Sequence, residues 1–93
     1  MRRAAKVDDN QAAIVAALRK IGAKVQSLAA VGNGCPDLLV NWRGMLTLLE
    51  LKDGSKPPSA RKLTPAQEKW HAEWGDAVRV VETVEQAIEA VTN

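Results

Sequence analysis

The sequence is poor in the residues from which several kinds of site are made. It has one cysteine, Cys35, and one histidine, His71, and it lacks both phenylalanine and tyrosine. An internal disulfide framework and a zinc-finger site are therefore excluded, because each needs several such ligands. No apolar run approaches the roughly 18 residues of a membrane span, and the basic N-terminus leads into charged, amphipathic sequence rather than the apolar core of a signal peptide. We expect a chain without membrane contact in a reducing, cytoplasmic compartment.

The composition is that of one globular domain. The chain has 93 residues, of which 46% are hydrophobic and 26% charged, and we treat residues 1–93 as a single unit. Its net charge of +2 is too small to indicate nucleic-acid binding by itself. Basic residues gather in an N-terminal arm (residues 1–6) and in a basic loop (residues 53–62). The candidate DNA contacts there are Arg2, Arg3, Lys56, Arg61 and Lys62.

Apolar spacing and turn residues predict seven elements in the order α-β-β-β-α-β-α. The predicted strands span residues 24–31, 37–42, 45–52 and 77–81. A first helix carries the stripe Val7, Gln11, Ile14, Leu18 and Ile21 and ends at Gly22, and a last helix follows Thr83. This order predicts an α/β fold, with a central mixed sheet flanked by helices.

The helix between the third and fourth strands follows Thr64 and ends at Gly75. We expect Trp70 and Trp74 to form its buried face with Ala66, and His71 to lie on its exposed face. Gln67 stands three residues after Thr64, so a capping box explains it without any function. It also lies on the side that faces the sheet, and the two roles are compatible.

The sharpest inference comes from a predicted hairpin around Arg43-Gly44. With a two-residue turn, Asp37 lies directly opposite Glu50, and such side chains have Cβ atoms roughly 5 Å apart on one face. A four-residue turn keeps both carboxylates on that face, whereas a three-residue turn separates them. Because side chains alternate along a strand, Lys52 joins Glu50 on the same side.

Two facing carboxylates on an apolar strand repel each other unless a positive charge compensates them. A divalent cation bound by Asp37, Glu50 and a backbone carbonyl offsets both charges. Oxygen ligands favour Mg²⁺, or Mn²⁺ in its place, over zinc. The competing interpretation is a surface salt bridge of Asp37 and Glu50 with Lys52 at frayed strand ends.

These residues resemble a known signature. The segment Gly34-Cys35-Pro36-Asp37-Leu38-Leu39-Val40, followed by Leu49-Glu50-Leu51-Lys52, is similar to the PD-(D/E)xK nuclease motif. Together with Leu63-Thr64-Pro65-Ala66-Gln67 and the first helix, it resembles the VRR-NUC group of small phage and bacterial nucleases. The resemblance covers nearly the whole chain and implies a restriction-endonuclease-like fold.

The resemblance also implies roles for individual residues. Asp37 and Glu50 would bind metal with the carbonyl of Leu51, and Lys52 would orient or help to deprotonate the attacking water. Gln67 would line the same site. The position of Gln11 is a glutamate facing the metal in many members; here the amide adds no negative charge, and a plain boundary role for Gln11 stays open.

The sequence therefore predicts a divalent-metal-dependent DNA endonuclease. Stand-alone members of the group resemble Holliday-junction resolvases and act as dimers, so we expect a homodimer that cuts branched DNA in a bacterial or phage-infected cell. Two alternatives belong to other classes. One is a non-catalytic nucleic-acid-binding module that uses the same sheet and basic loop, and the other is a small interaction protein.

Overall fold

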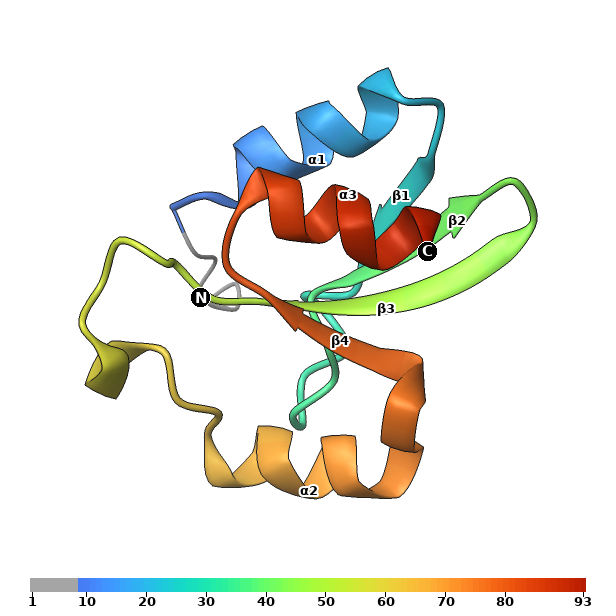
Figure 1. The fold of residues 1–93 in the computed structure, drawn as a ribbon. Helices are drawn as coiled ribbons and strands as arrows, with labels where there is room; N and C mark the ends of the chain where they lie inside the picture. Colours follow the sequence, from blue (N-terminus) through green and yellow to red (C-terminus); the bar gives the residue numbers. More distant parts are fainter. Residues whose placement is uncertain (1–8) are drawn as a thin grey trace.

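The computed structural model describes residues 9–93, which form three layers (Figure 1). The middle layer is a sheet with strand order β1-β2-β3-β4. Its strands are β1 (Lys24–Ser27), β2 (Leu38–Trp42), β3 (Met45–Leu51) and β4 (Val78–Val81). The helices α1 (Gln11–Lys20) and α3 (Val84–Thr92) cover one face, and α2 (Pro65–Trp74) lies on the other. The predicted order and the mixed sheet are confirmed.

Two short 3₁₀ turns complete the chain, η1 (Pro58–Ala60) and η2 (Gly75–Ala77). The first lies within the basic loop, and the second connects α2 to β4. Within residues 9–93, no helix is long and apolar enough to cross a membrane.

The hairpin between β2 and β3 has the predicted two-residue turn. Trp42 pairs with Met45, and both turn residues have positive φ, 54° at Arg43 and 85° at Gly44. This backbone matches the twist of the flanking strands. The next strand, β4, runs parallel to β3, which requires a long crossover connection. The basic loop and α2 supply that crossover (Figure 1).

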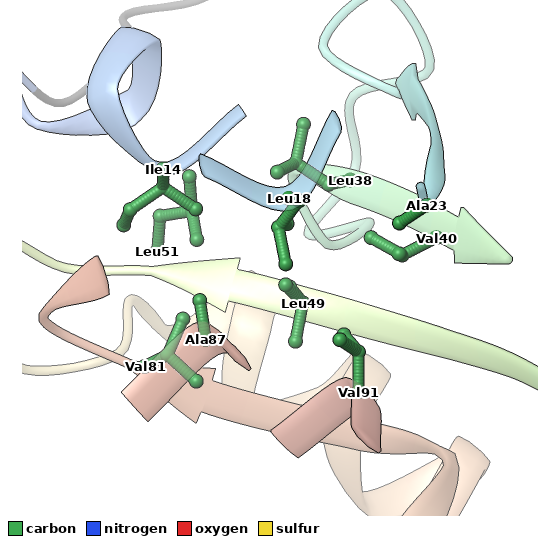
Figure 2. Packing of buried hydrophobic residues seen from close by; sticks show 10 residues of the cluster. All are labelled: Ile14, Leu18, Ala23, Leu38, Val40, Leu49, Leu51, Val81, Ala87 and Val91. Carbon is green, nitrogen blue, oxygen red and sulfur yellow. The ribbon is translucent and has the colours of Figure 1, made fainter. Parts of the chain in front are cut away.

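The core fills the space between the sheet and the pair α1 and α3 (Figure 2). Of its predicted stripe, α1 buries Ile14 and Leu18, whereas Ile21 lies beyond the helix and is 38% exposed. The buried set is Ile14, Leu18, Ala23, Leu38, Val40, Leu49, Leu51, Val81, Ala87 and Val91. Nine of the ten lie in the sheet or in the two helices, and Ala23 lies in the connection between α1 and β1, so the apolar burial that stabilises the fold is on this side of the sheet.

The first predicted strand was too long, since β1 ends at Ser27 rather than at residue 31. The Ser27 hydroxyl accepts the N–H of Ala29, and the N–H of Val31 turns back to the carbonyl of Leu28. These local bonds replace a strand ladder. Val31, expected in the strand, is instead 58% exposed.

The predicted buried face of α2 was also wrong. None of its residues is buried, and Trp74 is 56% exposed. Trp70 and Trp74 stack on each other instead, with ring centroids 4.4 Å apart. The side of α2 that meets the sheet carries polar residues, so apolar spacing indicated the wrong face.

Candidate active site

Strand β3 sends alternate side chains to opposite faces of the sheet. Leu49 and Leu51 enter the core, whereas Glu50 and the following Lys52 lie on the face that carries α2. Both charged residues are buried, with exposures of 1% and 9%. The salt-bridge interpretation at frayed ends is therefore wrong about their setting, because neither is a surface charge.

Asp37 lies just outside the regular β2–β3 ladder, which ends at the pair Leu38 and Leu49. Its N–H donates to the carbonyl of Leu49 at 3.0 Å, and its Oδ2 accepts the N–H of Leu51 at 2.7 Å. Asp37 thus does not form the predicted ladder pair with Glu50. Its carboxylate is instead fixed on the backbone between Glu50 and Lys52.

The carboxylate of Glu50 is held by two side chains of α2. Its Oε2 accepts a bond from Nε2 of Gln67 at 3.2 Å, and its Oε1 lies 3.2 Å from Nε2 of His71. Gln67 and His71 are four residues apart and therefore share one face of the helix. Glu50 is thereby oriented from both of its oxygens.

Gln67 also connects Glu50 to Lys52. The Lys52 ammonium donates to Oε1 of Gln67 at 3.0 Å, and the same oxygen accepts the N–H of Thr64 at 2.9 Å. With the Thr64 hydroxyl accepting the N–H of Gln67, a complete capping box is present. Both predicted placements of Gln67, in the cap and beside the charged residues, are thus observed.

A close backbone contact fixes α2 at this end. Gly34 has φ +83°, and a Cβ there would collide with the carbonyl of Ala66. Only glycine combines this conformation with such an approach. The loop before Asp37 therefore packs directly against the first turn of α2, next to Gln67.

His71 was expected on the exposed face of α2, and this was wrong, since 14% of its side chain is exposed. Burial first, and the Lys52 charge second, lower the pKa of His71. The neutral imidazole can donate to the Glu50 carboxylate when its proton is on Nε2. His71 lies four residues after Gln67, and this spacing was the signal in the sequence for its contact with Glu50.

The carboxylates of Asp37 and Glu50 both affect the pKa of a neighbouring thiol, that of Cys35. Burial raises the pKa of the Cys35 thiol, and the negative charges of Glu50 and Asp37 raise it further. The same potential attracts a cation. An ionised carboxylate oxygen has more than one lone pair, so an oxygen that accepts a hydrogen bond can also bind a cation.

This donor set fits Mg²⁺ or Mn²⁺, which prefer oxygen ligands and keep several waters. Asp37 and Glu50 would supply carboxylate oxygens, and the carbonyl of Leu51 stays a predicted third ligand. Across residues 9–93, no group of three or more His, Cys, Asp and Glu side chains is arranged to hold a metal. The metal site of Asp37 and Glu50 stays a prediction.

Gln11 occupies the first position of α1 and lines a groove with Val25, Ser27 and Leu38. Its predicted place beside the metal stays a prediction. The preceding residue, Asn10, contacts the site instead. Its side-chain amide donates through Nδ2 to the backbone carbonyl of Lys52. Nothing in the spacing of the first helix indicated this contact.

The basic loop is less positive than its composition indicates. Arg61 donates through Nη1 to both carboxylate oxygens of Glu82, at 3.1 and 3.2 Å, and Nζ of Lys56 lies 3.9 Å from Asp9. Lys62 is exposed, and no ion pair involves it within residues 9–93. Arg2 and Arg3 lie outside the described residues.

Comparison with solved structures decides the fold family. A structure described as a VRR_NUC domain matches this chain with a TM-score of 0.61 and 25% sequence identity, over 92% of this chain and 98% of the other. The chain has a VRR-NUC-type fold. The predicted resemblance is thereby confirmed, and the match points to a nuclease-type domain. No family model and no curated protein matches the sequence.

Proposed function

We propose that this VRR-NUC-type domain, residues 1–93, is a divalent-metal-dependent endonuclease that hydrolyses DNA phosphodiester bonds. One observation carries the proposal: Glu50 and Lys52 are buried side by side and joined through Gln67, next to the carboxylate of Asp37. Burying charged groups usually costs more stability than burying apolar residues of similar size. A role in chemistry accounts for that cost.

Asp37 and Glu50 would hold Mg²⁺ with the Leu51 carbonyl, and Mn²⁺ would substitute. When bound, the ion supplies Lewis-acid stabilisation of the transition state and lowers the pKa of coordinated water. Gln67 and His71 fix the orientation of Glu50, as supporting residues around metal sites do.

Lys52 would orient the attacking water or a phosphate oxygen through its ammonium group. Gln67 accepts from Lys52 and donates to Glu50, so the amide fixes both side chains, and its bond to Lys52 uses one of the three ammonium protons. Gln11, at the start of α1, would bond to water near the metal.

Contacts to the phosphate backbone would come from the basic loop and the N-terminal arm. Lys62 is the best placed, because it is exposed, whereas Arg61 and Lys56 approach acidic partners. Arg2 and Arg3 would extend the same contact. These residues carry no base-reading pattern, so recognition of branched DNA by its shape is favoured over recognition of sequence.

Cutting both strands of a four-way junction requires two active sites, and we propose a homodimer in a bacterial or phage-infected cell. The sheet face that carries α2 leaves apolar surface for a second copy. Leu46 is 67% exposed, Val80 is 46% exposed, and Trp74 lies exposed on α2.

The test is cleavage of labelled linear, flapped and four-way DNA with Mg²⁺, with Mn²⁺ and with EDTA. We expect cleavage of a branched substrate that EDTA abolishes and that Asp37→Asn or Lys52→Met removes while DNA binding persists. Binding without cleavage under any divalent ion would support the non-catalytic module instead. Absence of binding would leave the interaction protein.

A further inference from the structure

Asn10 occupies the N-cap position of α1 but does not cap the helix. Asparagine is favoured there because its side-chain oxygen accepts a backbone N–H of the first turn. In this chain the side chain makes no such bond. Its Nδ2 donates instead to the carbonyl of Lys52 at 3.1 Å and to that of Glu82 at 3.0 Å. A local bond has been replaced by two contacts that are distant in sequence.

These two carbonyls follow the ends of the parallel pair β3 and β4. The N–H of Lys52 donates to the carbonyl of Val81 at 3.0 Å, and the N–H of Gly54 donates to that of Glu82 at 3.3 Å. The Asn10 amide adds a bridge across both strands just beyond their last residues. The peptide units on both sides of Lys52 are therefore fixed.

The orientation of the amide is also fixed. Turning it over would place Oδ1 of Asn10 against two carbonyl oxygens, which cannot donate. As it stands, Oδ1 is buried and has no hydrogen-bond partner within the described residues. An unsatisfied buried acceptor destabilises the fold, so the two donated bonds are kept despite a cost.

We infer that Asn10 is a positioning residue for Lys52. With its backbone held on both sides, the ammonium of Lys52 reaches Gln67 by side-chain torsions alone. The inference rests on the proposed nuclease function, because the consequence of positioning is seen in the rate of cleavage. Its structural half, the rigidity of the Lys52 backbone, can be measured without activity.

The experiment compares Asn10→Ala and Asn10→Asp with a matched control, Asn41→Ala. Oδ1 of Asn41 accepts the N–H of Gly44 at 2.9 Å in the hairpin turn, at the opposite end of β3 from Lys52. Amide hydrogen exchange is followed residue by residue, and cleavage is resolved into kcat and KM.

In Asn10→Ala we expect the amides of Lys52 and Gly54 to exchange at least about tenfold faster, while Gly44 is unchanged. The control reverses this pattern. We expect kcat to fall about 10- to 100-fold in Asn10→Ala, since misplacement of a reacting group by about 1 Å has that effect. KM and DNA affinity stay near their original values, and Asn10→Asp is the more severe change.

Unchanged exchange at Lys52 in Asn10→Ala would overturn the inference, as would equal losses of kcat in Asn10→Ala and Asn41→Ala. If Asn10→Asp fails to fold, Asn10→Ala still decides. If the original protein cleaves no DNA, the proposed function fails separately, and exchange at Lys52 still decides whether Asn10 holds that backbone.

Discussion

The two faces of the sheet differ in the kind of side chain that they bury. Above it, α1 and α3 close a core in which every buried side chain is apolar. Below it, α2 meets the sheet through Gln67 and His71, which bond to the buried Glu50. Neighbouring residues of β3 therefore have different surroundings on the two faces. Leu49 contributes to the apolar core, whereas Glu50 is a buried carboxylate to which the proposed function assigns metal binding.

Truncating the core face should give the largest effect. Leu49→Ala removes a fully buried side chain and should lower the free energy of unfolding by about 2–5 kcal/mol. Leu46→Ala is the matched control on the same strand, where the side chain is 67% exposed, and should cost less than about 0.5 kcal/mol. Urea unfolding at low protein concentration measures both. Similar losses in the two variants would contradict the division between faces.

Removing the charge of Glu50 on the opposite face should impair cleavage without lowering stability. Glu50→Gln should slow cleavage by roughly 10²- to 10³-fold, while the thermal midpoint is unchanged or higher, because a neutral amide is less costly to bury than a carboxylate. Glu89→Gln, an exposed change of the same type, should alter neither quantity. A large drop in the midpoint of Glu50→Gln with cleavage retained would assign Glu50 to the fold.

The glycines of the loop before Asp37 test how α2 is held. Gly32 and Gly34 both have positive φ, but only at Gly34 would a Cβ meet α2. Gly32→Ala should cost about 1–2 kcal/mol from backbone strain alone. Gly34→Ala should cost about 1–3 kcal/mol more and should slow cleavage, because α2 must move with Gln67. Equal effects on stability and cleavage would show that the contact is unimportant.

The smallest effects are expected in the basic loop, where neighbouring cations have different settings. Lys62→Ala should reduce the salt dependence of DNA binding by about one unit of slope and leave stability unchanged. Arg61→Ala should cost about 1 kcal/mol of stability through its half-buried pair with Glu82, with a weaker effect on binding. The reverse outcome would place Arg61 on the DNA and Lys62 in the fold.

The architecture could be predicted because its signals are local. The Arg43-Gly44 turn sets the register of β2 and β3, and the Thr64 and Thr83 caps mark the starts of α2 and α3. Each of these depends on a few adjacent residues. The grouping of Glu50 with Lys52 follows from strand alternation and is equally local.

The overlong first strand reflects local bonds at Ser27 and Leu28. The errors at α2 and at Asn10 share another cause, because there the deciding contacts are distant along the chain. The orientation of α2 depends on a crossover and on the contact at Gly34, so the spacing of Trp70 and Trp74 suggested burial where polar residues make the contact. His71 was misplaced with them. Asn10 was overlooked because its partners lie 42 and 72 residues away.

The span of these contacts along the chain bears on the order in which the site forms. Asp37 meets Leu51 across 14 residues through a tight hairpin, whereas Asn10 meets Glu82 only after 72 residues have been synthesised and folded. Short loops close faster than long ones. The carboxylates should thus assemble early and the lysine be fixed last, an order that pulse-labelled exchange during refolding would reveal.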